Sequence, residues 1–228
     1  MKRTVFCCMM VIIAALLFAC DTNDESYYLY DVNEDGSITV MGVSETYSKE
    51  LSVPAQIDGK TVTAIGDYAF YRNTDIRKIT LPDSVVTIGE CAFADSDNLT
   101  SINIGKNCKS IGLQAFEGCI SLEKIKLSGQ LLTIEDLAFN GCIRLESFSP
   151  PASLNEIGVD VFNDCEQLII NPKNCPVIEA YANTHGIPTG FTESDDYQIL
   201  KIAILTALAL AIILAVHLII KKIRKKTD

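Results

Sequence analysis

A chain of 228 residues with hydrophobic segments at both ends has room for one modest domain between them. Its 29 acidic and 19 basic side chains give a net charge of −10. All the acidic residues except Asp228 lie between residues 21 and 198, where 28 of them face 11 Lys and Arg, so this segment carries about −17. Such a surplus favours solubility and argues against nucleic acid and anionic membrane surfaces as partners of this segment.

Residues 1–20 have the pattern of an export signal. Lys2 and Arg3 precede the apolar run 5–18, which is too short for an ordinary membrane-spanning helix. The run ends in Leu-Phe-Ala-Cys, which resembles a bacterial lipobox, so we expect Cys20 to be lipidated and to become the new N-terminus. The alternative is a conventional or uncleaved signal with an incidental cysteine.

We expect residues 21–50 to form an N-terminal β-hairpin cap. Two runs of alternating polarity, 27–32 and 37–43, flank the turn sequence Asn-Glu-Asp-Gly at 33–36, which is typical of a hairpin.

The same turn also matches the first half of a calcium loop. Asp31, Asn33 and Asp35 place oxygens at positions 1, 3 and 5, and Gly36 follows. Position 12 is Gly42 where calcium loops carry a bidentate glutamate, and the flanks are strand-like. We therefore favour an ordinary turn and expect no metal.

The middle of the chain is an internal repeat of 23 residues. Three apolar columns define it: Ile65, Ile88, Ile111, Ile134 and Ile157; Phe70, Phe93, Phe116, Phe139 and Phe162; and Ile76, Leu99, Leu122, Leu145 and Leu168. Alanine precedes the phenylalanine except at Val161, and glycine follows the isoleucine except at Glu135. A unit this short cannot bury its own apolar face, so the units must stack and share one core.

Each unit contains one strand-like stretch. Residues 76–81, 99–104 and 122–127 follow a Leu-x-x-Ile-x-Leu pattern whose end alternates inward and outward, as in a strand. Stacking therefore predicts a short parallel sheet. The Ile-Gly-x-x-Ala-Phe segment is too short for more than a helical turn.

The segment 111–122, Ile-Gly-Leu-Gln-Ala-Phe-Glu-Gly-Cys-Ile-Ser-Leu, resembles the consensus of the BspA-like, or treponemal-type, leucine-rich repeats. The resemblance covers roughly residues 51–191. It assigns 51–171 to the repeats and 172–191 to a C-terminal cap, because Cys-Pro-Val-Ile-Glu-Ala-Tyr-Ala at 175–182 is similar to the cap of that family. It implies a β-rich solenoid of the α/β-horseshoe type that serves in adhesion or partner recognition, and it implies no catalytic residue.

The chain ends in a predicted membrane anchor. A short acidic stalk, 192–198, precedes the apolar segment 199–220, which is long enough for a helix to cross the hydrocarbon core of about 30 Å. The basic tail 221–228 follows at once and should stay cytoplasmic by the positive-inside rule. We therefore expect a protein of the cell membrane and cell surface with its repeat domain outside.

Six cysteines lie between Asp21 and the stalk, and Cys119, Cys142 and Cys165 share one repeat column. Cysteines in adjacent turns would lie about 5 Å apart, within disulfide reach, but with parallel side chains. We favour buried free thiols over a disulfide ladder. Zinc is disfavoured because no Cys-x-x-Cys occurs and His185 is the one exported histidine.

No arrangement typical of an enzyme is present. With one exported histidine there is no Ser-His or Cys-His pair to propose, and the glycines follow the repeat and form no phosphate-binding loop. We expect no catalytic residue and no cofactor.

The outward face of the predicted sheet is the candidate binding site, because solenoids bind along such extended faces. It should carry lysines, hydroxyls and an amide but no carboxylate: Lys78, Thr80, Ser101, Asn103, Lys124, Lys126, Ser147 and Ser149. The sequence therefore predicts a membrane-anchored adhesion or binding module for a protein or glycan. The alternative is an envelope scaffold or sensor subunit acting through its transmembrane helix, and a plain solvated sheet face is equally compatible with the pattern.

Overall fold

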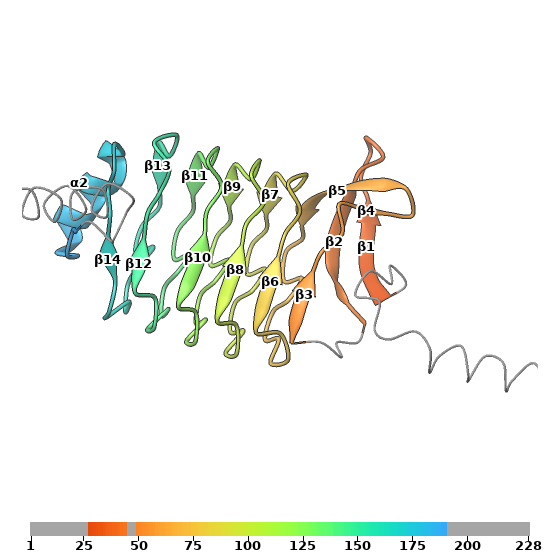
Figure 1. Cartoon of the computed structure of the whole chain (residues 1–228), viewed down its shortest axis with the longest axis horizontal. Helices are drawn as coiled ribbons and strands as arrows, with labels where there is room; N and C mark the ends of the chain where they lie inside the picture. The colour runs from red at the N-terminus through yellow and green to blue at the C-terminus, as the bar shows by residue number, and fades with distance from the viewer. Residues whose placement is uncertain (1–26, 45–48, 191–228) are drawn as a thin grey trace, which may run out of the picture. The chain divides into compact units, whose positions relative to one another are not determined.

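The computed structural model describes residues 27–44 and 49–190. They form a solenoid whose successive turns each contribute short β-strands (Figure 1). The predicted signal 1–20 with Cys20, the stalk 192–198, the helix 199–220 and the tail 221–228 all lie outside the described residues. Within the described ranges, no helix has the length and apolar character needed to cross a membrane.

One side of the solenoid is the four-stranded parallel sheet expected from the repeat, here called the front sheet. Its order is β10 (Lys124–Lys126), β8 (Ser101–Asn103), β6 (Lys78–Thr80) and β3 (Glu50–Ser52). Strands of neighbouring repeats pair in register, so that Lys78 lies opposite Ser101. The central residue of each strand points into the core, and its two neighbours point outward.

A second parallel sheet, the long sheet, covers another side of the solenoid and was not predicted. It contains β7 (Thr87–Ile88), β9 (Ser110–Ile111), β11 (Thr133–Ile134) and β13 (Glu156–Ile157). These two-residue strands are too short to show an alternating pattern in the sequence. Their isoleucines belong to the repeat column that precedes the glycine.

The N-terminal segment extends the long sheet. β1 (Tyr28–Val32) and β2 (Ile38–Val43) form an antiparallel hairpin. β2 pairs in parallel with β5 (Lys60–Ile65), which in turn pairs with β7 and, antiparallel, with β4 (Gln56–Ile57). The Tyr28 hydroxyl donates a 3.0 Å hydrogen bond to the Ser52 carbonyl, which ties the hairpin to the front sheet.

The front sheet ends at β10, which corrects the expectation that Ser147 and Ser149 belong to it. β12 (Ser147–Phe148) pairs with β14 (Ile169–Ile170), and no pairing joins it to β10 among the described residues. Two local features of the sequence accompany the break. Phe148 replaces the smaller isoleucine of the earlier repeats and packs into the core. Ser149 precedes Pro150, which restricts the backbone of Ser149.

The core is organised around a ladder of phenylalanine rings. Adjacent rings lie 5.1 to 5.5 Å apart between centroids, with interplanar angles of 9° or less, from Phe70 through Phe93, Phe116 and Phe139 to Phe162. Tyr181 closes the ladder edge-on to Phe162 at 6.0 Å. All five phenylalanines are buried. One apolar column therefore runs through every repeat.

The repeats contain no α-helix within the described residues, so the α/β-horseshoe expectation is wrong in that respect. The Gly-x-x-Ala-Phe segments instead donate backbone hydrogen bonds to the next turn: Phe70 N to Ala92 O at 2.7 Å, and Phe93 N to Ala115 O at 2.8 Å. Turns stacked in this way satisfy one another's polar groups without a helix.

Two positions in every turn have a left-handed backbone, which lets the chain bend tightly. The first is held by Tyr68, Cys91, Gln114, Leu137 and Asp160, and the second by Arg72, Asp95, Gly118, Gly141 and Asp164. Glycine alone adopts this region without steric cost. The other side chains are held there by the stacking of adjacent turns.

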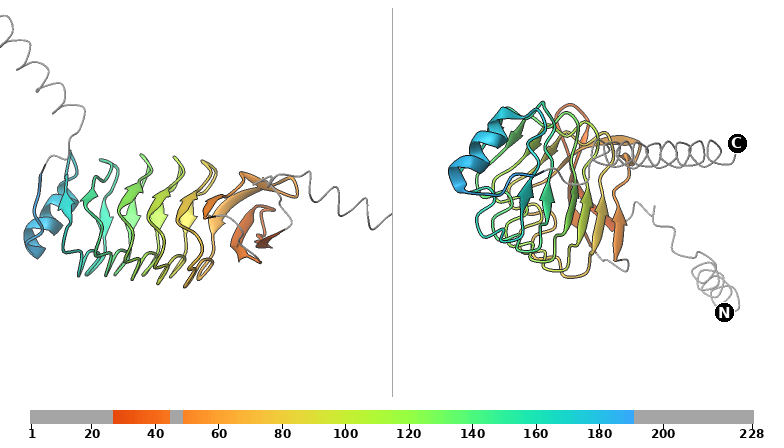
Figure 2. Two further views of the ribbon diagram at one scale, coloured as in Figure 1. Left: turned by 60° about the horizontal axis from the view of Figure 1, so that its bottom comes forward. Right: turned by 60° about the vertical axis from the view of Figure 1, so that its left-hand side comes forward.

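The C-terminal end is covered by the one α-helix of the described residues, α2 (Pro176–His185), which buries Ile178, Tyr181 and Ala182. It begins with proline in its first turn and ends at Gly186 with a φ of 65°, and Ile187 N donates to Ala182 O at 2.9 Å. The helix blocks the open end of the core (Figure 2).

The left-handed positions give a test of the turn geometry. Gly141 has a φ of 72°, and an added Cβ would meet only ordinary contacts, so Gly141→Ala tests the backbone alone. We expect it to lower the free energy of unfolding by about 1 kcal/mol. Gly129→Ala is the control, because Gly129 has open space around it and no left-handed φ, and it should leave stability equal or higher. Urea unfolding followed by circular dichroism measures both. Equal losses in the two variants would contradict this account.

Candidate binding face of the front sheet

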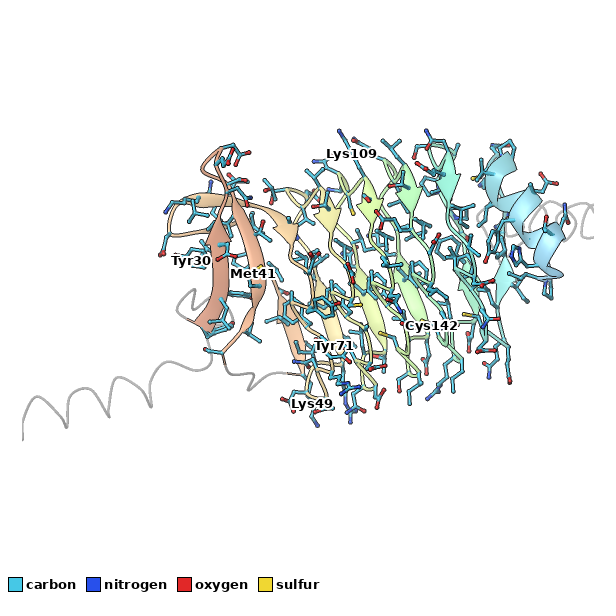
Figure 3. All side chains as sticks on the ribbon, turned by 180° about the vertical axis from the view of Figure 1, so that it is seen from behind. Tyr30, Met41, Lys49, Tyr71, Lys109 and Cys142 are labelled. Carbon is cyan, nitrogen blue, oxygen red and sulfur yellow. The ribbon has the colours of Figure 1, made fainter. Side chains whose placement is uncertain are left out.

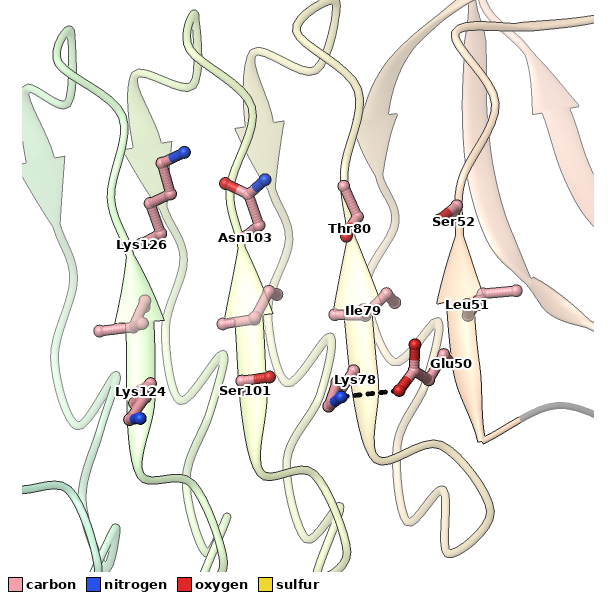
Figure 4. Close-up of a pocket in the computed structure, with 12 residues that line it drawn as sticks. Glu50, Leu51, Ser52, Lys78, Ile79, Thr80, Ser101, Asn103, Lys124 and Lys126 are labelled. Atoms are coloured by element: carbon pink, nitrogen blue, oxygen red, sulfur yellow. Dashed lines mark hydrogen bonds and ion pairs between the residues drawn. The ribbon is translucent and has the colours of Figure 1, made fainter.

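The front sheet brings together six of the eight predicted site residues. Lys78 and Thr80 come from β6, Ser101 and Asn103 from β8, and Lys124 and Lys126 from β10 (Figure 4). The lysines and Thr80 are exposed, and Ser101 and Asn103 are half-buried. Ile79 and Ile102 between them are buried, which anchors each strand to the core.

Two further residues, Glu50 and Ser52 of β3, belong to the same face and were not predicted. β3 stands 28 residues before β6, whereas the later repeats are spaced by 23. The 23-residue spacing therefore does not predict the position of β3. The available signal was the alternation in Glu50-Leu51-Ser52, whose buried leucine occupies the place of Ile79. The face thus does hold a carboxylate.

Glu50 changes the charge of the face. Its Oε1 lies 2.6 Å from Lys78 Nζ, and both side chains are more than half exposed. An exposed pair of this kind contributes at most about 1 kcal/mol to stability. It nevertheless neutralises the positive charge at β6.

A second ion pair lies in the turn after the strands. Lys106 Nζ is 2.7 Å from Asp83 Oδ2. The hydrogen bond from Lys106 lowers the pKa of the Asp83 carboxyl, and the charge on Lys126 adds to this effect. The same contact raises the pKa of Lys106. Neither Lys124 nor Lys126 has a carboxylate within ion-pair distance in the described part of the chain.

The face is an open groove of about 310 Å³. Its lining is made of the outward residues of the four front-sheet strands with the edges of the central aliphatic side chains: Glu50, Leu51, Ser52, Lys78, Ile79, Thr80, Ser101, Ile102, Asn103, Lys124, Ile125 and Lys126. The lining contains lysine, hydroxyl and amide groups but no histidine or cysteine. Such a surface can bind a ligand by charge and hydrogen bonds.

The cysteine column has a structural role. Ser96, Cys119, Cys142 and Cys165 occupy the same place in successive turns, and each side chain donates to the carbonyl oxygen of a ladder phenylalanine. The distances are 2.8 Å for the Ser96 hydroxyl and 3.1 to 3.2 Å for the three thiols. All six cysteines of the described residues are free, as favoured from the sequence.

Burial raises the pKa of the thiols in this column. It raises the pKa of Cys119 to about 12 and that of Cys142 well above its ordinary value. A thiol with a raised pKa is protonated at neutral pH, and the thiolate is the reactive form.

The polar side chains of the hairpin turn and of His185, which were considered as metal or catalytic candidates, form local hydrogen bonds and ring contacts. In the hairpin turn, Ser37 donates backbone and side-chain hydrogen bonds to Asp35, which lower the pKa of that carboxyl. Asn33 donates to the Ser37 hydroxyl. His185 stacks on Tyr181 at 4.0 Å, with Nδ1 2.9 Å from the Tyr181 carbonyl. Within residues 27–44 and 49–190, no three His, Cys, Asp or Glu side chains are placed to hold a metal ion.

Stacked 23-residue turns with a parallel front sheet and one shared apolar core define a leucine-rich-repeat solenoid. The family model for the BspA type leucine rich repeat region matches residues 47–183 in six copies. The chain belongs to this family.

Solved structures of leucine-rich-repeat proteins are similar to the chain, including one from T. pallidum and one from Bacteroides ovatus. A leucine-rich-repeat protein of T. pallidum, TpLRR, is 29% identical with a TM-score of 0.61, over 64% of this chain and 69% of that one. A leucine-rich-repeat protein from Bacteroides ovatus is 31% identical with a TM-score of 0.57, over 63% of this chain and 39% of that one. No curated protein matches the sequence.

The thiol assignment is testable by labelling with iodoacetamide at pH 8 and site-resolved mass spectrometry. We expect Cys119 and Cys142 to stay unlabelled in the native protein and to react fully in denaturant, because burial raises their pKa and closes access. Cys165, which is partly exposed, should react faster than either and serves as the internal control. A disulfide-linked peptide joining two of these cysteines would contradict the assignment.

Proposed function

We propose that this protein is a membrane-anchored binding or adhesion module that recognises a protein or glycan at the cell surface through the front sheet. The observation that carries the proposal is the composition of that face. It presents lysines, hydroxyls and an amide on a regular sheet, in a segment whose overall charge is about −17.

The geometry of the sheet supports recognition. Neighbouring strands are about 4.8 Å apart, and successive outward side chains on one strand are about 6.6 Å apart. Backbone pairing in register fixes each position, as between Thr80 and Asn103. A surface whose groups are already in place loses little conformational entropy when a ligand binds.

The sequence supports placement at the membrane. The export pattern of residues 1–20 and the apolar segment 199–220 with its basic tail put the repeat domain outside the cell. Lipidation of Cys20 would attach the N-terminal side to the same leaflet, and the repeats would then lie close to the membrane.

The face is tested by blocking it sterically, without assuming a ligand chemistry. Thr80 on β6 and Thr87 on β7 are both exposed strand threonines, one on the front sheet and one on the long sheet. Tyrosine suits a strand at either place. We expect Thr80→Tyr to reduce the capture of surface ligands severalfold in pull-downs with the full-length chain, because the ring covers the groove.

Thr87→Tyr is the matched control and should capture ligands like the unmodified protein. Equal loss in both variants, or no loss in either, would place recognition away from the front sheet. A ligand retained by both variants but lost when the sequence 199–220 is scrambled at constant hydrophobicity would instead favour the scaffold or sensor alternative.

A further inference from the structure

Positive charge on the front sheet is concentrated at one strand. The charge of Lys78 on β6 is offset by Glu50, whose Oε1 lies 2.6 Å from Lys78 Nζ. Lys124 and Lys126 of β10 have no carboxylate within ion-pair distance in the described ranges, and both are exposed. An incoming anion therefore meets lysines that form no ion pair at β10, whereas the lysine at β6 is already paired.

The two lysines form part of a repeated arrangement. Lys124 lies opposite Ser101 and Lys126 lies opposite Asn103 on the neighbouring strand β8. Adjacent strands are about 4.8 Å apart, so each lysine has a hydroxyl-bearing or amide-bearing residue opposite it on the same face. Figure 4 shows these four side chains on the outward side of the two strands.

Each lysine–polar pair suits one carboxylate. The ammonium supplies charge and hydrogen-bond donors, and the serine hydroxyl or asparagine amide supplies another donor for the second carboxylate oxygen. The two pairs repeat at the spacing of residues i and i+2 in a strand, about 6.6 Å. An extended peptide presents alternate side chains on one face at nearly the same spacing.

We propose that the pairs Lys124–Ser101 and Lys126–Asn103 form two carboxylate sites that read an extended acidic peptide with Asp or Glu at alternate positions. This inference rests on the proposed function and names the ligand class of the same face. The peptide lies along β10 with its two carboxylates over the two pairs. The acidic surface elsewhere on the domain repels such a ligand and so restricts it to this strand.

The spacing is tested with two fluorescein-labelled peptides of equal composition. One contains Glu-Thr-Glu flanked by threonine and glycine, and the other contains Glu-Glu-Thr in the same flanks. Binding to the full-length chain is measured by fluorescence anisotropy at low ionic strength, where exposed charge pairs are least screened. We expect the alternating peptide to bind several times more tightly, because its carboxylates share one face.

Three substitutions that remove one positive charge each locate the site. Lys124→Gln and Lys126→Gln should each weaken binding of the alternating peptide about threefold, and together about tenfold, as expected for exposed charge pairs. Lys109→Gln is the control, because Lys109 is exposed beside β9 of the long sheet, at the upper edge in Figure 3. It should leave the affinity unchanged.

Three outcomes would overturn the inference. Equal affinity for the two peptides would show that binding does not depend on acidic residues at alternate positions. Equal weakening by Lys109→Gln would show a general charge effect. Tighter binding of a polyuronate chain than of the alternating peptide, with the same dependence on Lys124 and Lys126, would assign the site to an acidic glycan. In that last case, and in the other two when Thr80→Tyr still blocks ligand capture, the proposed function stands while the peptide assignment fails.

Discussion

The stacking of successive turns in register is the constraint on which the rest of the structure depends. A 23-residue turn has neither a core nor a complete set of backbone hydrogen bonds by itself. Both are supplied by the neighbouring turn. Phe93 N bonds to Ala115 O at 2.8 Å, and the Phe93 ring stacks on Phe116 at 5.1 Å. The same stacking of one turn on the next thus provides the backbone hydrogen bonds and the apolar contacts. A shift out of register would break both kinds of interaction.

This constraint also explains residue choices that are unfavourable locally. Leu137 has a φ of 57° and Tyr68 one of 58°, a region that costs residues other than glycine roughly 1–2 kcal/mol. They are tolerated because the turn is fixed from both neighbouring turns. The thiol column has a similar origin. The turn leaves a phenylalanine carbonyl in the interior, and a small donor such as Ser96 or Cys142 bonds it without disturbing the stack.

The sequence predicts the features that recur as a clear residue pattern, and it misses those that leave no pattern or that depend on a single turn. The phenylalanine ladder, the front strands and the buried thiols follow from columns that recur, and the structure confirms them. The long sheet leaves no alternating signal because its strands have two residues. The place of Glu50 depends on an irregular first turn. The front sheet ends before Phe148, whose ring packs against that of Phe162 with the centroids 4.7 Å apart, a tertiary contact that no local pattern encodes.

The basic residues of the solenoid fall into two groups, and the difference bears on recognition. Four of them form ion pairs with carboxylates of adjacent turns or strands: Arg72 with Asp95, Lys78 with Glu50, Lys106 with Asp83, and Arg144 with Glu123. These pairs offset part of the repulsion within a strongly acidic domain. Lys124 and Lys126 do not take part, and they stand on the last strand before the front sheet breaks. Neither lysine forms an ion pair that joins adjacent turns, so a ligand can bind them without breaking one.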